Sequence, residues 1–574
     1  MRATHFLLFV WLLFPSLALA QSHGQNSDPS TNDANLAAEV KALREALSQT
    51  QKQLAAQQQD IETLRAQLKA GPASAATNEP PPPGGEKTTH DSASSSLQAT
   101  DGYAGTNIEL QSPAQGTQHK VKSEEAPLGS FKVGEAVMTL GGFVDLENVF
   151  RTTNTQDNIA TAFGTIPFNN SAQGRVTEFR STAQFSRLSW MVKESLRGND
   201  ITGYIEGDFS GNDAANVYQS VNGHTNRLRL YFADIKHGKW EILGGQTWSW
   251  LTPNRNGIGP MPVDLAITYN EDQNIGVGLP YTRAAEFRVA YHANEHLALG
   301  VGIEDPNQYV GNYVALPTGF TNLGAQIDNN TNAGAANLMP DILSKITYDK
   351  QFSGRKFHAE VTGLFTGAHA STMPVRSTSF KTHTALGGGG QIAANYELVP
   401  HKLVVLANAF WSDGGAHYLV ATGPELVVRP NPAGTDVNLS MVHAGAGSAG
   451  LEWRASSKEA FAVYYGADYF GRNFFPDTTN TTHPGTIIGF GGPGSPNNNN
   501  RAIQQATFDW ILTFWSAPGY GAVQSYVQYS YLTRALWFVA PGTPKNAHLS
   551  MVYAGFRYVL PSTAGTLLRV PRPD

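Results

Sequence analysis

The stretch TNRLRLYFADIKHGKWEIL, residues 225 to 243, decides the fold. Its first half alternates with a period of two, so that arginines share one face of an extended segment and large apolar residues share the other. The arginines are Arg227 and Arg229, and the apolar residues are Leu228, Leu230 and Phe232. This pattern fits either a soluble sheet whose apolar face is packed or a barrel wall with lipid outside and water inside.

Composition excludes several classes of protein. The chain has 574 residues, a formal net charge of -6 and no cysteine. The mild charge gives no basic footprint for nucleic acid, so we expect no nucleic-acid partner. The lack of cysteine implies that stability comes from the hydrogen-bonded framework of a large fold. No segment supplies ~20 uninterrupted apolar residues, which argues against a helical membrane protein.

The N-terminus, MRATHFLLFVWLLFPSLALA, has the layout of a secretory signal peptide over residues 1–20. Arg2 precedes an apolar run from Phe6 to Phe14, and Ala18-Leu19-Ala20 offers a cleavage site with small residues. We therefore expect export from the cytoplasm and a mature protein that begins near Gln21.

A heptad pattern follows the signal peptide. Apolar positions step by four and three from Leu36 to Leu68, with Thr50 and Gln57 at two seam positions. The pattern predicts an α-helical coiled coil over residues 36–69, and the alternative is a lone amphipathic helix packed on a domain. Residues 71–130 are rich in Pro, Gly, Ser and Thr and are typical of a flexible linker.

Alternation with a period of two recurs through residues 131–560. In MTLGGFVDLENVF, for example, Leu140 and Val144 lie on the face opposite Asp145. Long connections rich in Asn and Gly alternate with short turns, which gives about sixteen strands with both ends of the sheet on the short-turn side. We therefore predict an all-β transmembrane barrel of about 16 antiparallel strands over 131–560, followed by a C-terminal tail at 561–574.

The main alternative fold is a secreted soluble β-protein, such as a sandwich or a propeller. Three features argue against it: charged residues recur on the polar faces of long strands, loop lengths alternate strictly, and no blade repeat of fixed period is visible. The barrel interpretation places the protein in the outer membrane of a bacterium, in contact with its lipid.

In a membrane barrel the polar faces of the strands look into the lumen. The predicted pore-lining residues are Arg180, Arg187, Arg227, Arg229, Arg283, Arg288, Glu206 and Asp208. One interpretation is a salt-bridge lattice that keeps the lumen open. The other is a selectivity role, because crowded arginines favour solutes that carry carboxylate or phosphate. The second interpretation predicts a preference for small anions.

The segment GGQTWSWLTPNRNGIGPMPV, residues 244–263, ends a strand and enters a loop rich in Pro and Gly. A long loop here either folds inward and narrows the pore or caps the outside of the barrel.

Several short stretches together resemble the DcaP-like trimeric porins of the outer membrane. They are Phe185-Ser186-Arg187, Ile205-Glu206-Gly207-Asp208-Phe209, the strand of Arg227 and Arg229, Gly245-Gln246-Thr247-Trp248-Ser249, and Pro340-Asp341. The resemblance is clearest over residues 137–350. It implies a porin that takes up small anionic solutes such as dicarboxylates. It also implies a homotrimer whose N-terminal coiled coil lies in the periplasm.

One feature departs from that family, whose barrels commonly finish on a strand with a terminal aromatic residue. This chain continues past Phe556 and Tyr558 into STAGTLLRVPRPD, so its assembly signal is expected to be internal or specific to its lineage.

Two other functions compete with the porin. A trimeric adhesin or autotransporter also joins a coiled coil to a barrel, and some outer-membrane barrels are hydrolases. The chain shows neither a Gly-x-Ser-x-Gly elbow nor a His-Glu-x-x-His helix, so we expect no catalytic residue, metal or cofactor.

Overall fold

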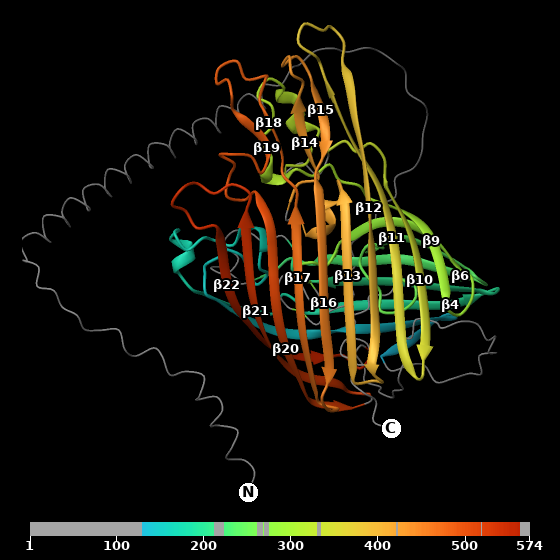
Figure 1. The fold of residues 1–574 in the computed structure, drawn as a ribbon. Coiled ribbons are helices and arrows are strands. Elements are labelled where there is room, and N and C mark those ends of the chain that lie inside the picture. The colour runs from blue at the N-terminus through green and yellow to red at the C-terminus, as the bar shows by residue number, and fades with distance from the viewer. Residues whose placement is uncertain are drawn as a thin grey trace, which may run out of the picture. The chain divides into compact units, whose positions relative to one another are not determined.

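Sixteen antiparallel strands close into a barrel in the computed structural model (Figure 1). The structure describes residues 129–211, 223–260, 268, 275–329, 335–420, 423–517 and 519–562. The barrel strands are β2 (Ala136–Arg151), β4 (Arg187–Leu196), β5 (Asn199–Asp208), β6 (Arg227–His237), β7 (Trp240–Trp248), β8 (Arg283–His292), β9 (Leu297–Glu304), β10 (Asp341–Phe352), β11 (Arg355–Thr372), β12 (Lys381–Val399), β13 (Leu403–Asp413), β16 (His443–Arg454), β17 (Glu459–Phe470), β20 (Asn500–Ala517), β21 (Gly521–Leu536) and β22 (Asn546–Val559). The last strand pairs with the first from Phe143↔Val559 to Arg151↔Met551, which closes the sheet and confirms the predicted strand number and last strand.

Shorter strands and 3-10 turns accompany the sixteen barrel strands. Strands β1 (Ser130–Val133) and β3 (Glu178–Thr182) pair with β2. The hairpins β14 (Leu426–Pro430)–β15 (Val437–Met441) and β18 (Asn473–Pro476)–β19 (Ile487–Phe490) lie in long connections. Single 3-10 turns are η2 (Phe163–Thr165), η3 (Gln173–Arg175), η4 (Gly311–Tyr313), η5 (Thr321–Ala325) and η6 (Ala416–Leu419). The predicted alternation is confirmed, since both hairpins lie at the same end of the barrel in Figure 1, opposite the short turns.

The strands separate apolar and charged side chains onto opposite faces. In β2, Val144 is 59% exposed on the outer face, whereas Asp145 and Glu147 are buried on the inner face. The same arrangement holds in β5, where Ile205 is exposed outside and Glu206 is buried inside. This alternation is what the period-two pattern of the sequence predicted.

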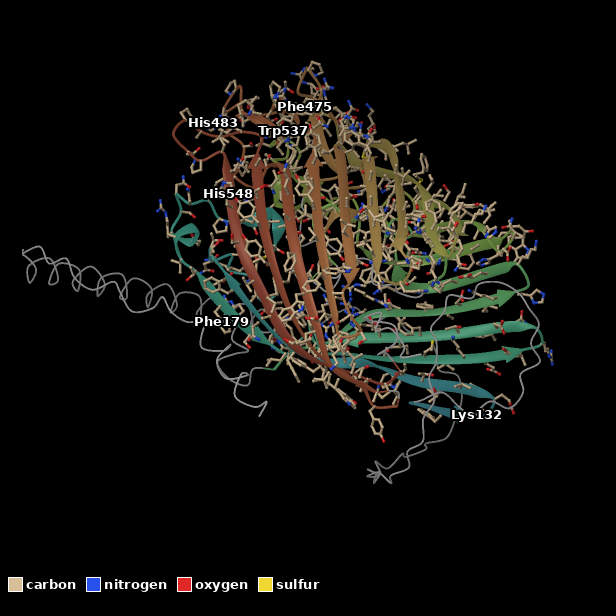
Figure 2. The ribbon with its side chains drawn as sticks, turned by 60° about the horizontal axis from the view of Figure 1, so that its bottom comes forward. Lys132, Phe179, Phe475, His483, Trp537 and His548 are labelled. Carbon is tan, nitrogen blue, oxygen red and sulfur yellow. The ribbon has the colours of Figure 1, made fainter. Side chains whose placement is uncertain are left out.

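Aromatic side chains gather on the outer face near both ends of the barrel. Near the short turns, the rings of Trp240 and Tyr291 have centroids 4.8 Å apart. Near the long loops, Tyr531 and His548 stack with centroids 6.0 Å apart. Figure 2 labels His548, on β22, and Phe179, on β3, which is 64% exposed. Two such bands are typical of barrels that cross a membrane.

One face prediction was wrong. Leu228 is exposed on the outside as predicted, but Leu230 and Phe232 are buried on the inside. The register between β5 and β6 shifts at Glu206/Gly207, so that two residues of β6, Arg229 and Leu230, lie opposite the single residue Glu206 of β5. This β-bulge reverses the alternation after Arg229. Leu230 and Phe232 therefore pack inside the barrel in a cluster with Met191, Tyr204 and Leu243.

The interior holds apolar cores formed by two long loops. Residues 152–177 contribute Ile159 and Ile166 to a cluster that includes Leu549 of β22. Trp250 and Leu251, in the described part of the long loop after β7, join a second cluster with Leu343 of β10 and Phe410 of β13. These loops therefore pack against inward-facing apolar residues, so the inner wall is not lined by charge alone.

The signal peptide, the coiled coil and nearly all of the linker lie outside the described residues, as does most of the tail. Among the described residues, no helix is long and apolar enough to cross a membrane.

Candidate functional site: the charged interior of the barrel

The structure brings five of the predicted pore-lining residues together on β4, β5 and β6. We call this group the arginine lattice, and it consists of Arg187, Arg227, Arg229, Glu206 and Asp208. The middle strand, β5, carries both carboxylates, and the flanking strands carry the arginines. Because inward residues of neighbouring strands face each other at this register, opposite charges meet side by side.

The lattice is held by short contacts. Arg229 reaches both carboxylates, with Nε 2.9 Å from Glu206 Oε1 and Nη1 2.8 Å from Asp208 Oδ2. Arg227 Nη2 lies 2.6 Å from Asp208 Oδ2, and Arg187 Nη1 lies 3.6 Å from Glu206 Oε1. Every arginine here has a carboxylate partner, so the lattice is largely self-neutralised. The geometry matches the salt-bridge interpretation of these residues more closely than a free anion site.

The other predicted residues lie apart from the lattice. Arg288, on β8, lies 3.4 Å from Glu286 Oε1 and over the ring of Trp250. Arg283, at the start of β8, lies 5.2 Å from the ring centroid of Trp248. Arg180, on β3, has a side chain that is 42% exposed and an Nη2 3.5 Å from Glu178. Arg180 is therefore the most solvent-accessible arginine of the predicted set.

The described parts of the long loop after β7, residues 249–260 and 275–282, lie inside the barrel, which favours the inward arrangement of the two considered for residues 244–263. Arg255 forms a bidentate ion pair with Glu452 on β16, across the interior. The backbone N–H of Asn254 donates to Glu360 on β11 at 3.1 Å, and that of Gly257 donates to Asp349 on β10 at 3.0 Å. The loop is therefore tied to several walls by charged side chains.

Glycines allow residues 275–282 of this loop to lie directly on the barrel wall. A Cβ on Gly466 of β17 would come within 1.7 Å of Val277 O, and a Cβ on Gly278 within 2.1 Å of Gly447 O. The Gly278 backbone is also fixed by polar contacts, since its N–H donates to Asp468 and its oxygen accepts from Asn408. Larger residues at these two glycine positions would push the loop away from the wall.

A polar cluster joins η6 to Glu425 and to the start of β10. His417 contacts Glu425 through Nδ1, and its Nε2 lies 3.5 Å from Asp341 Oδ2. The adjacent Tyr418 donates its hydroxyl to Asp341 at 3.0 Å. Burial lowers the pKa of His417, but the Glu425 carboxylate, together with Asp341 and Glu304, outweighs burial and raises the pKa to about 9. His417 is therefore a cation at neutral pH and binds η6 to the rim of the barrel.

Several charged residues of the interior were not predicted from the sequence as lining residues. Arg151 is fully buried at the end of β2, where it lies 2.9 Å from Glu178 and donates to Ile159 O. Lys345, also fully buried, lies 3.0 Å from Glu360. Strand alternation alone could have found both, as well as Arg534 of β21. Nothing in the local pattern around Arg255 indicates that it crosses the interior.

The solved structure of the outer membrane channel DcaP of Acinetobacter baumannii matches this chain with a TM-score of 0.51. The match has 17% sequence identity and covers 75% of this chain and 100% of that one. This chain has the fold of that channel. The resemblance drawn from the sequence is therefore confirmed at the level of the fold, which is what 17% identity can show.

Two further matches are more distant. The anion-selective porin from Comamonas acidovorans matches with a TM-score of 0.39 and 12% identity, over 74% of this chain and 100% of that one. OmpF of Salmonella typhi matches with a TM-score of 0.41 and 12% identity, over 75% of this chain and 100% of that one. No family model matches this chain, and no curated protein matches its sequence.

Proposed function

We propose that the protein is an outer-membrane porin through which small hydrophilic solutes diffuse passively, with a preference for small anions such as dicarboxylates. The observation that carries the proposal is the closed barrel, with apolar side chains outside and charged side chains inside. A bilayer requires every backbone polar group to be bonded internally, and a closed barrel meets that requirement. The proposed role is that of a channel and not of an enzyme.

The preference for anions rests on inward arginines that keep access to water. The side chain of Arg180 is 42% exposed, and that of Arg227 is 29% exposed. A guanidinium stays charged at all physiological pH values and presents several N–H donors to a carboxylate. The lattice carboxylates Glu206 and Asp208 oppose this preference, so we expect moderate selectivity and not strict exclusion of cations.

We also propose a homotrimer whose coiled coil, residues 36–69, lies in the periplasm. The support is the heptad pattern, which follows directly after a predicted signal peptide and precedes the barrel. Because the rod precedes the first barrel strand, and that strand begins on the short-turn side, the rod belongs on the periplasmic side.

Conductance across a planar lipid bilayer tests these proposals with the purified full-length protein. We expect ion channels that close in three steps, and a reversal potential under a KCl gradient that has the sign of anion selectivity. Cation selectivity would contradict the anion preference alone. Folded protein that never conducts would contradict the porin and favour the adhesin or the hydrolase.

A further inference from the structure

Arg534 differs from every other buried cation of the described residues. Eight arginine or lysine side chains are buried there: Arg151, Arg187, Arg229, Arg255, Arg288, Lys345, Arg534 and Arg557. Seven of these have a carboxylate oxygen within 4 Å, as in the pair of Arg557 with Asp145. Arg534 is 3% exposed and has no carboxylate partner among the described residues.

Neutral oxygens hold Arg534 in place near the end of β21 where the long loops lie. Its Nε donates to Ile166 O at 2.7 Å, and its Nη1 donates to Asn497 O and, at 3.1 Å, to Asn500 Oδ1. Its guanidinium carbon lies 4.7 Å from the ring centroid of Phe168. The charge is therefore oriented by two loops but not neutralised.

The third guanidinium nitrogen, Nη2, has no hydrogen-bond partner among the described residues. Nη2 is therefore the nitrogen of Arg534 that is left to bind a solute. Buried charges are normally paired, because an uncompensated charge in a low-dielectric site is costly. An anion that reached Nη2 would complete the coordination of Arg534.

We propose that Arg534 is an anion-binding subsite at the extracellular entrance of the channel, and that its ligand is one oxygen of a small carboxylate solute. This inference rests on the proposed porin function and deepens it. Two of the three nitrogens already donate to protein oxygens, so only a single-point contact remains and a bidentate clamp is excluded. Such a contact is weak, and weak binding is what conduction requires of a site on a solute path.

Arg534 adds a second source of anion preference to the inward arginines Arg180 and Arg227. The sequence pointed to the arginine lattice, whose guanidinium groups are occupied by Glu206 and Asp208. Arg534 lies on β21, far along the chain from the lattice, and no carboxylate among the described residues occupies its guanidinium. No carboxylate among the described residues cancels its field, which therefore acts on a passing solute.

Three variants separate charge from structure. Arg534→Gln removes the charge, and Arg534→Lys keeps it without the planar fork. Asn500→Asp places a carboxylate where Asn500 Oδ1 now accepts from Arg534, so it keeps Arg534 and cancels its charge. Asn500→Asp loses the hydrogen bond from Nδ2 to Gly164 O, whereas Arg534→Gln keeps it. If both variants show the same loss of anion binding, the cause is therefore the charge of Arg534 and not that hydrogen bond. Arg376→Gln, in an exposed loop, is the control for net charge.

Each variant is first shown to be folded by its heat-dependent mobility in gels and is then measured in planar bilayers. The readouts are the chloride-to-potassium permeability ratio and the block of KCl current by succinate. We expect Arg534→Gln and Asn500→Asp to weaken succinate block about fivefold, the effect of one unit charge at contact distance in water. Both should also lower the permeability ratio, whereas Arg534→Lys and Arg376→Gln should stay near wild type.

Two results would overturn the inference and leave the porin intact. One is an anion-selective wild type whose selectivity and block are unchanged in Arg534→Gln. The other is a loss in Arg534→Gln with full retention in Asn500→Asp, which would make Arg534 a structural clamp for the loops. A conducting but cation-selective wild type that succinate does not block would instead refute the anion preference itself.

Discussion

The wall of β4, β5 and β6 and the wall of β20, β21 and β22 look alike from outside and differ in what holds their inner faces. Both expose large apolar residues outward, such as Leu188 and Ile205 on the first and Phe508 and Phe556 on the second. Inside, ion pairs hold the first wall, whereas apolar contacts to the loop of residues 152–177 hold the second.

The membrane constrains only the outer face of each strand. The outer face must be apolar wherever it meets hydrocarbon, so it obeys one rule on every strand. The inner face meets either water or a folded loop, and a distant part of the chain decides which. The inner face is therefore held mainly by ion pairs on one wall and, beside its own charged residues Arg534 and Arg557, by loop contacts on the other.

The largest expected effect comes from removing a lattice carboxylate. Asp208→Asn leaves Arg227 and Arg229 without their shared oxygen, and breaking a buried pair in this way costs about 4 kcal/mol of unfolding free energy. The same change removes one negative charge from the lattice, so the chloride-to-potassium permeability ratio should rise. Urea unfolding of the protein in lipid vesicles and bilayer reversal potentials measure the two effects.

The control for this change is Asp305→Asn, because Asp305 is exposed in the loop after β9. Asp305→Asn should alter neither the unfolding free energy nor the chloride-to-potassium permeability ratio. If Asp208→Asn behaved like the control, the lattice would not stabilise its wall, and the contrast between the two walls would lose its physical basis.

The second wall should respond to an apolar truncation. Leu549 of β22 is fully buried among residues of the 152–177 loop, and Leu549→Ala should cost about 3 kcal/mol through the cavity that it leaves. The loop should then loosen and be cut by trypsin faster at the exposed Arg175. The outward Val552→Ala on the same strand serves as control, and equal cleavage rates in both variants would contradict the loop contact.

A smaller effect concerns η6, which is held by the ion pairs of His417 in addition to the apolar packing of Tyr418 and Leu419. The pKa of His417 is raised to about 9 from 6.5, so its stabilising contribution is complete below pH 6.5 and is lost as pH rises through about 9. We expect fluctuations of the single-channel current to grow over that interval as η6 detaches from Asp341 and Glu425. Recording at pH values below 6.5 and above 9 measures the change.

His417→Gln should show the enlarged fluctuations at every pH, with no further dependence on pH. His483→Gln, in the exposed loop labelled in Figure 2, should retain the wild-type dependence. A pH response that survives in His417→Gln would mean that another group controls the loop.

Much of the fold could be predicted because the outer face follows one rule. The alternation of Leu140, Asp145 and Ile205 with their neighbours gave the strand faces, and loop lengths gave the strand number. The bulge at Arg229 and Leu230 could not be read from the residues, because one extra residue reverses the faces without altering composition.

The site was harder to predict than the fold, because its contacts join distant parts of the chain. Arg255 pairs with Glu452, 197 residues away, and no local pattern links them. The inward loops carry apolar residues such as Ile166 and Trp250 without periodicity, so they resemble ordinary surface loops in the sequence. Which arginines have carboxylate partners, and which one does not, follows only from the three-dimensional arrangement.

The least disruptive experiment tests the bulge that separates the two halves of β6. The chain has no cysteine, so single cysteines report cleanly on side-chain orientation. Ala233 is exposed on the outer face, an odd number of residues from the outward Leu228, and only a bulge puts both on the same side. A fluorophore attached in Ala233→Cys should be quenched by lipids that carry a nitroxide on the acyl chain, as in Leu228→Cys. The inward Ala298→Cys should resist quenching. If the Ala233 variant followed the Ala298 variant, the strand would alternate without interruption, Leu230 would face lipid, and the apolar cluster with Met191 and Leu243 would not exist.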